Sequence, residues 1–327
     1  MNIIEKLNLP PFEPFEFEEA HAYNYWRDYY GALEIIKEYC GLKPNTKFKD
    51  FSWYHGAFPP GYNTLSILTN NLFDKNKIYF VTDNEQKEVL VKNGYTKTYC
   101  IGLPIIYVPI QKVERIKDSL LIMPSHSLVG CETYNVDKRG EFLDEILAKN
   151  NFKSNNILAC LHSNDVKNNF WVNELKERGI SFVEGAKNND KNAYKRQVVL
   201  FSQFEYMITN DFGSHVMYAL YLGVKVAILN FPIHLKSLDH EVNERIFPET
   251  GMTANDLEKL KNAKFACLYT DINNSKNYQE IGNYYVGLKH KISPDELKKL
   301  FGFSLHGKIF WMIHKIRDRF YEFKSRI

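Results

Sequence analysis

Three polar segments of this 327-residue chain carry side chains that could bind phosphate or accept a proton. Asn210–Ser214 combines a glycine with a hydroxyl, which suits a loop that turns into a helix and presents backbone N–H groups to a phosphate. Pro124–Ser127 offers an imidazole between two hydroxyls. His55 stands before Gly56, and an imidazole with an ordinary pKa of about 6.5 can act as a general base near neutral pH.

Each segment also has a purely structural interpretation. Gly213 could serve close approach of the backbone to a ligand, or it could adopt a positive φ in a plain turn. Ser214 could cap the following helix as well as donate to a phosphate. His126 could be exposed at a capped helix start, and His55 could lie in a buried turn where backbone groups satisfy its ring.

Further polar residues follow other predicted strands. His162 and Ser163 could line the same cleft, although a structural role explains them equally well. Glu184 could lie near a nucleobase, and Asp211 belongs to the glycine-containing loop. A structural role is favoured for four weaker candidates, Asp83, His234, Asp239 and His240. Neither His234 nor His240 stands at a metal-ligand spacing from a cysteine, so we expect no metal site.

The elements that must position these residues alternate between strands and helices, which predicts an α/β fold with parallel sheets. Ligands of such sheets bind beyond the carboxyl ends of the strands, where the polar segments fall. Strands are expected at 51–54, 77–82, 98–104, 119–123, 156–161, 180–183, 205–209 and, as the final one, 224–229. Helices are expected at 18–39, 64–72, 84–93, 166–178, 191–204 and 215–222.

A charged stretch at 111–118 interrupts this alternation and marks a predicted domain boundary. We expect one Rossmann-like domain over residues 1–117 and a second over 118–290, followed by a helical tail over 291–327. No repeat or low-complexity tract is visible in the sequence.

Composition excludes several classes of protein. A hydrophobic fraction of 44% and an aromatic fraction of 15% argue against extensive disorder. A net charge of +3 and the absence of a nucleic-acid-binding motif give no reason to expect a nucleic acid partner. The five cysteines form no CxxC pair, which favours free thiols in a reducing compartment. Without a signal peptide or an apolar stretch of about 20 residues, we expect a cytoplasmic protein.

The last 25 residues, 303–327, predict an amphipathic helix with a basic edge on each side of its apolar face. Trp311 and Tyr321 add aromatic side chains of the kind found at membrane interfaces. Such a helix could lie on anionic lipid of the inner membrane, or it could pack back onto the first domain. The apolar residues are Leu305, Ile309, Met312, Ile313, Ile316, Phe320, Phe323 and Ile327.

Parts of residues 50–235 resemble GT-B glycosyltransferases. FSQFEYMITNDFGSHVMYALYLGVKVAILN (201–230) is similar to the strand, polar loop, short helix and strand that bind the donor's phosphates in that family. FSWYHGAFPPG (51–61) resembles the HG turn of the CDP-glycerol polymerases of teichoic-acid synthesis, where the histidine is taken as the base. LVKNGYTKTYCIGLPIIY (90–107) resembles the stretch before the interdomain linker of these enzymes.

The resemblance implies a metal-independent and cofactor-free GT-B glycosyltransferase with a nucleotide-sugar donor domain, an acceptor domain and His55 as the catalytic base. The acceptor would be a lipopolysaccharide, capsule or other lipid-linked glycan at the cytoplasmic face of the inner membrane. Tyr218-Ala219-Leu220 departs from the family's EAL stretch, which weakly favours a CMP- or CDP-linked donor. The predicted donor-binding residues are Ser125, His126, Ser127, His162, Ser163, Glu184, Asp211, Gly213 and Ser214.

Two other functions remain open from the sequence. One is a nucleotide-sugar epimerase on the same scaffold, which would produce an epimerised nucleotide-sugar without an acceptor. The other is a non-catalytic protein of a polysaccharide assembly complex, which would bind glycan or lipid but no nucleotide.

Overall fold

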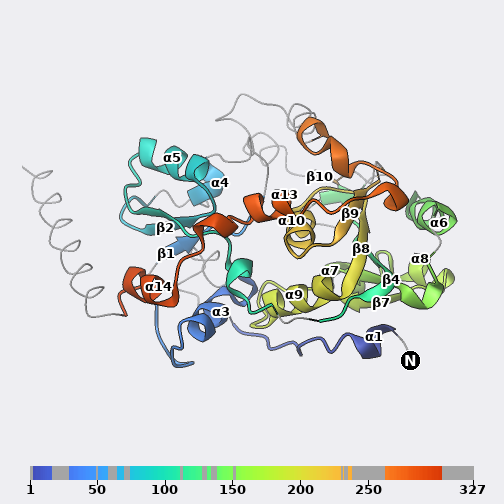
Figure 1. Ribbon diagram of the computed structural model, residues 1–327, viewed down its shortest axis with the longest axis horizontal. Coiled ribbons are helices and arrows are strands. Elements are labelled where there is room, and N and C mark those ends of the chain that lie inside the picture. Colours follow the sequence, from blue (N-terminus) through green and yellow to red (C-terminus); the bar gives the residue numbers. More distant parts are fainter. Residues whose placement is uncertain are drawn as a thin grey trace, which may run out of the picture.

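The computed structural model is a mixed α/β structure built on parallel sheets, which confirms the predicted α/β fold with parallel sheets (Figure 1). It describes residues 3–16, 29–48, 51–57, 65–69, 74–110, 113–126, 131–133, 138–149, 152–229, 231, 235–237 and 262–303. Within these residues the strands form a three-stranded parallel sheet, a five-stranded parallel sheet and a two-stranded antiparallel pair.

The three-stranded sheet has the order β1-β2-β3. Its strands β1 (Phe51–Trp53), β2 (Ile78–Val81) and β3 (Thr98–Cys100) agree with the prediction except at their ends. On one face, side chains of β2 pack with α4 (Leu65–Thr69) and α5 (Asn84–Lys92). The other face belongs to the core that includes α3 (Ala32–Tyr39).

Local signals explain where α5 begins and ends. The Asp83 carboxylate accepts a hydrogen bond from the Gln86 N–H at 2.9 Å and so caps the helix. Gly94 follows the last turn with φ of 90°, a conformation that glycine adopts without a Cβ clash. Asp83 therefore has the structural role that was favoured from the sequence, as the N-cap of α5.

The five-stranded sheet has the order β7-β6-β4-β8-β9, with all its strands parallel. Its strands are β4 (Ile116–Ile122), β6 (Ile157–Leu161), β7 (Ser181–Glu184), β8 (Phe204–Thr209) and β9 (Lys225–Ile228). If these five strands are numbered 1 to 5 in the order in which they occur in the chain, their order across the sheet is 3-2-1-4-5. This is the strand order of a Rossmann fold. The chain therefore reverses direction across the sheet between β4 and β8, and this pair forms the topological switch point.

Apolar residues cover both faces of this sheet. Leu121 packs in the core that contains α9 (Ala193–Gln203) and α10 (Ser214–Tyr221). Leu120 and Ile122 point to the opposite core, which contains α6 (Arg139–Lys149) and α8 (Val172–Glu177). The uninterrupted apolar run of β4 follows from burial on both sides.

The predicted helix over 166–178 is wrong, because two short helices replace it. α7 (Ser163–Lys167) ends before Asn169 and Trp171, whose φ angles are 55° and 74°, and α8 begins at the next residue. Trp171 is fully buried, and its ring contacts Phe142 of α6. Packing of the indole accounts for a break that helical periodicity does not predict.

The expectation that residues 224–229 form the last strand is also wrong. β10 (Leu235–Ser237) follows β9 and pairs antiparallel with β5 (Cys131–Thr133). Short 3₁₀ turns complete the described elements: η2 (Tyr29–Gly31), η3 (Pro104–Tyr107), η5 (Ser154–Asn156), η6 (Ala266–Leu268), η7 (Ile272–Asn274) and η8 (Leu288–His290).

Both ends of the described chain cross between the sheets. The first segment, which includes α1 (Ile3–Lys6), lies against the five-stranded sheet, and Gln203 Nε2 donates to the Leu7 carbonyl at 2.7 Å. The last segment runs from α13 (Gln279–Tyr285), packed on α10, to α14 (Pro294–Leu300) beside the three-stranded sheet (Figure 1).

The predicted amphipathic tail helix spans residues 303–327, and all of it except Phe303 lies outside the described residues. Among the described helices, none combines the length and the apolar character that a bilayer crossing requires.

Candidate functional site

A cavity of about 480 Å³ lies at the carboxyl ends of the strands of the five-stranded sheet. Residues after β4, β6, β7 and β8 form its wall together with α9 and α10, and the turn after β1 of the other sheet closes it. His55, His126 and Ser214 come from distant parts of the sequence, and all three line this cavity. The cavity includes the switch point between β4 and β8, where open α/β sheets bind their ligands.

Ser125 and Asn210 join the two loops of the switch point. The Ser125 N–H donates to Asn210 Oδ1 at 2.7 Å, and Asn210 Nδ2 donates to Ser125 Oγ at 2.9 Å. The Trp171 Nε1–H donates to the Ser125 carbonyl at 3.0 Å. Because the Ser125 hydroxyl accepts one of these bonds, it keeps its own hydrogen for donation.

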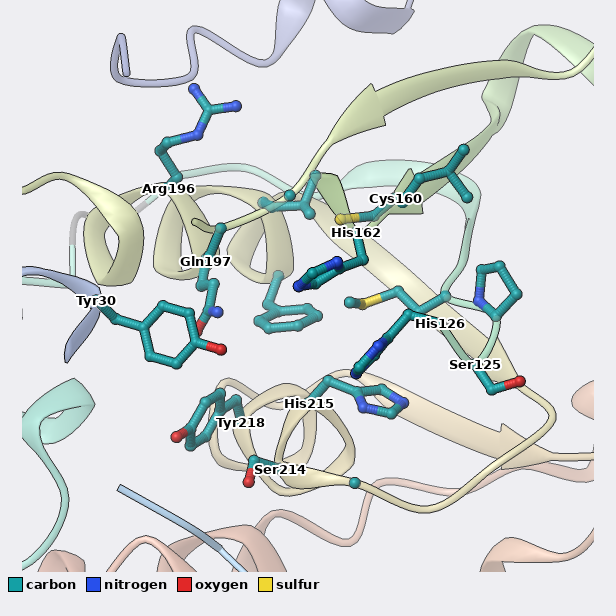
Figure 2. Close-up of a pocket in the computed structure, with 18 of the residues that line it drawn as sticks. Tyr30, Ser125, His126, Cys160, His162, Arg196, Gln197, Ser214, His215 and Tyr218 are labelled. Atoms are coloured by element: carbon teal, nitrogen blue, oxygen red, sulfur yellow. The ribbon is translucent and has the colours of Figure 1, made fainter. Parts of the chain in front are cut away.

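Three imidazoles gather on one side of the cavity (Figure 2). The rings of His126 and His162 stack, with centroids 4.6 Å apart and an interplanar angle of 21°. His215 Nε2 lies 3.2 Å from Thr209 Oγ1. Burial and then the proximity of His126 lower the pKa of His162 to about 4. Burial lowers the pKa of His215 to about 4 against the smaller, opposing effect of Asp211. The rings of His162 and His215 are therefore neutral near pH 7.

His215 is a site residue that sequence reasoning missed, although it follows Ser214 directly. It also explains the glycine before Ser214. Gly213 has φ of −157°, an extended conformation that any residue can adopt, so of the two alternatives for this glycine the positive φ is wrong. A Cβ at Gly213 would lie 2.9 Å from His215 Nδ1. The glycine is needed because the imidazole of His215 occupies that space.

Ser214 connects the two sheets. It is the first residue of α10 and Gly213 is the N-cap, so the expected capping role of the Ser214 hydroxyl is wrong. Its Oγ accepts a hydrogen bond from the N–H of Ala57 at 3.2 Å. Ala57 is buried and ends the His55-Gly56-Ala57 turn after β1. The Ser214 hydroxyl also bonds to the hydroxyl of Tyr218.

Two buried phenols hold His55. His55 Nδ1 lies 2.8 Å from the Tyr194 hydroxyl, and the two rings are nearly parallel with centroids 6.0 Å apart. The Tyr218 hydroxyl donates to the His55 carbonyl at 2.9 Å, and the two phenols bond to each other. Burial raises the pKa of Tyr194 well above its ordinary value, so this phenol stays protonated.

The directions of these hydrogen bonds follow from the number of hydrogens. The single hydroxyl hydrogen of Tyr218 goes to the His55 carbonyl, which can only accept. When the Tyr194 hydroxyl donates to the Tyr218 oxygen, its own oxygen is left to accept from His55 Nδ1–H. A neutral imidazole with its hydrogen on Nδ1 carries its lone pair on Nε2, which is the tautomer that a general base needs.

The remaining predicted residues lie at the rim of the cavity or beyond it. Glu184 ends β7 and lines the cavity, and its carboxylate pairs with Lys187 Nζ at 3.0 Å. Asp211 lines it as an exposed side chain. Ser163 begins α7 and, in the described part of the chain, does not belong to the cavity wall. The predicted residue Ser127 and the weaker candidates His234, Asp239 and His240 lie outside the described residues.

Two side chains of α9, Arg196 and Gln197, also belong to the wall and were not predicted (Figure 2). The Arg196 guanidinium donates to the carbonyls of Pro10 and Glu184 and lies 3.8 Å from the ring centroid of Phe12. Gln197 Oε1 is buried and accepts no hydrogen bond from any residue that the structure describes. A bound ligand could donate a hydrogen bond to this buried oxygen.

The described wall carries little charge. Its ionised side chains are Glu184, Arg196 and Asp211, so Arg196 supplies the one fixed positive charge of this part of the cavity. Across the described residues, no group of three or more His, Cys, Asp or Glu side chains is placed to hold a metal ion.

No family model and no curated protein matches the chain. Among solved structures, it is similar to a UDP-glucosyltransferase from Polygonum tinctorium capable of glucosylating indoxyl, in complex with 3,4-dichloroaniline. The identity is 13% and the TM-score is 0.26, over 63% of this chain and 53% of that one. The chain thus spans about half of that enzyme's length, and a similarity of this size decides neither fold nor activity.

Proposed function

We propose that this chain is a metal-independent glycosyltransferase of the GT-B type. It would move a sugar from a nucleotide-activated donor to a glycan acceptor. The observation that carries the proposal is the shared cavity. A ligand site at the switch point of a Rossmann-ordered sheet is lined by an imidazole from a second sheet, and Nδ1 of that imidazole lies 2.8 Å from the buried Tyr194 hydroxyl.

The nucleotide part of the donor would lie at the switch point. Gly213, Ser214 and His215 at the start of α10 line the cavity, so the backbone N–H groups of this first turn would bind the phosphates together with His126 and the hydroxyl of Ser125. The buried acceptor Gln197 Oε1 suits an exocyclic amino group, such as the one of cytosine. Tyr218 occupies the position of the family's ribose-binding carboxylate, which again favours a CMP- or CDP-linked donor over a UDP- or GDP-linked one.

His55 would act as the base. As the acceptor oxygen forms a bond to the anomeric carbon, the bond from that carbon to the phosphate oxygen breaks. The acceptor's proton goes to His55 Nε2, and the bonding electron pair leaves with the nucleotide. Backbone N–H groups and side-chain donors stabilise the charge that develops on the phosphate.

The acceptor would be a lipopolysaccharide, capsule or other lipid-linked glycan, bound on the side of residues 1–117. The basic, amphipathic pattern of residues 304–327 supports peripheral binding at the cytoplasmic face of the inner membrane. Deleting residues 304–327 should abolish binding to anionic vesicles and leave thermal unfolding of the remaining chain unchanged. Vesicle binding that persists after the deletion would contradict this part of the proposal.

A thermal-shift series with CMP, CDP, UDP and GDP tests the nucleotide site. We expect stabilisation by at least one cytidine nucleotide, because binding to the folded state raises the unfolding temperature. Incubation of the matching nucleotide-sugar with lipid-linked glycans should then release free nucleotide only when an acceptor is present. Absence of any nucleotide effect would favour a glycan-binding protein, and an epimerised nucleotide-sugar formed without acceptor would favour an epimerase.

A further inference from the structure

We propose that His126, His162 and His215 form an anion site that takes up a proton when the phosphates of a nucleotide bind, so that affinity for the donor rises as the pH falls. This inference rests on the proposed function for the identity of the ligand, but not for the existence of an anion site.

The position of the three rings is the first reason. They come from the segments after β4 and β6 and from the first turn of α10, so they surround the switch point where a phosphate is expected (Figure 2). The His126 and His162 rings are in stacking contact, and His215 interacts electrostatically with His126. One phosphate at this place would contact more than one imidazole.

The charge of the cavity is the second reason. A nucleoside diphosphate ester brings two negative charges, and Arg196 is the one fixed cation in the described wall. Arg196 already donates to the carbonyls of Pro10 and Glu184. Protonation of an imidazole is the remaining way for these side chains to supply positive charge.

The groups that face the three rings set the direction of the effect. His126 faces His162 and His215, and its proximity disfavours a positive charge on each of them. Asp211 is the acidic group that acts on His215. Glu184 and Arg196 are the other ionised groups of the described wall. Without a ligand the rings of His162 and His215 are neutral at pH 7, and a bound phosphate favours their charged form.

Linkage then fixes the sign of the pH dependence. If binding takes up one proton, affinity increases by up to about tenfold for each unit by which the pH falls, in the window between the pKa values of the free and the bound state. The lower end of that window is at a pH of about 4, which is the pKa of His162 and of His215 in the ligand-free protein. The upper end is the higher pKa that these rings acquire beside the phosphate.

The test uses calorimetric titration of the full chain with CDP-glycerol, whose phosphates do not titrate near neutral pH. We expect Kd to fall at least about threefold from about pH 7 to about pH 6, with proton uptake seen as a dependence of the heat on buffer ionisation. His126→Asn, an exposed position, and His215→Asn should each reduce the pH dependence. His290→Asn, on η8, should leave it intact and serves as the matched control.

NMR titration of the imidazoles with sulfate, which stays doubly charged throughout this range, separates the two proposals. Sulfate should raise the pKa of at least one of the three rings. CDP-glycerol binding with the same Kd at both pH values and no proton uptake would overturn the inference and leave the proposed function standing. A sulfate-induced rise in pKa with no binding of any nucleotide would instead keep the anion site and overturn the proposed function.

Discussion

The imidazole Nδ1 of His55 lies 2.8 Å from the hydroxyl oxygen of Tyr194, although 139 positions separate these residues in the chain. A Tyr194 hydroxyl that donates to the Tyr218 oxygen accepts from Nδ1–H, which leaves the lone pair of the ring on Nε2. In the proposed reaction Tyr194 is thus a positioning residue, whose effect passes through His55.

Tyr194→Phe should lower kcat by about tenfold, since the ring loses the acceptor that fixes its tautomer and orientation. KM for the donor should change little, and the acidic limb of the kcat–pH profile should shift, which a merely structural residue would not cause. Tyr285→Phe is a matched control, because its buried hydroxyl has no hydrogen-bond partner among the described residues. Equal kinetic effects in the two variants would contradict this role for Tyr194.

Gly213→Ala should weaken donor binding by about tenfold, because the added methyl group would push the imidazole of His215 from its place. Calorimetric titration with the donor nucleotide measures this change. Gly140→Ala in α6 is the control, since the new Cβ would meet only the flexible end of the Arg178 side chain. Unchanged affinity of the Gly213→Ala variant would separate the glycine and His215 from the phosphate site.

Ser214→Ala should reduce the free energy of unfolding by about 1–2 kcal/mol, because the buried N–H of Ala57 loses its acceptor. Urea denaturation followed by circular dichroism gives this value. We also expect weaker donor binding, as predicted from the sequence. A variant with wild-type stability would show that the contact between α10 and the turn after β1 does not form in solution.

Acidification should destabilise the ligand-free protein. The pKa values of His162 and His215 in the folded state, both about 4, lie below their ordinary value. The unfolded chain therefore binds more protons between about pH 6.5 and pH 4, and stability falls as the pH drops through this window. Replacing His215 by Asn should flatten the decline in urea midpoint, and an unchanged decline would contradict burial of that ring.

Strand positions were predictable because apolar runs and turn glycines are local signals. Leu120, Leu121 and Ile122 point to two different cores, and burial on both faces leaves an uninterrupted apolar run in the sequence. The cavity edge was predictable for the same reason, since polar residues that follow parallel strands meet at one end of the sheet.

The errors have long-range causes. The break before α8 depends on the burial of Trp171 against Phe142 of another helix, which helical periodicity does not reveal. The contact between Tyr194 and His55 joins α9 to the turn after β1, and a tyrosine on the buried side of a helix looks like an ordinary core residue. The purpose of Gly213 depends on where the ring of His215 points.

The most direct test of the central claim is to measure donor affinity and single-turnover transfer together for His55→Ala. Our account predicts that donor Kd stays near the wild-type value while the transfer rate falls by about 10²–10⁴, the usual contribution of a general base. A transfer rate close to wild type, with the donor still bound, would remove His55 from the reaction and contradict the account.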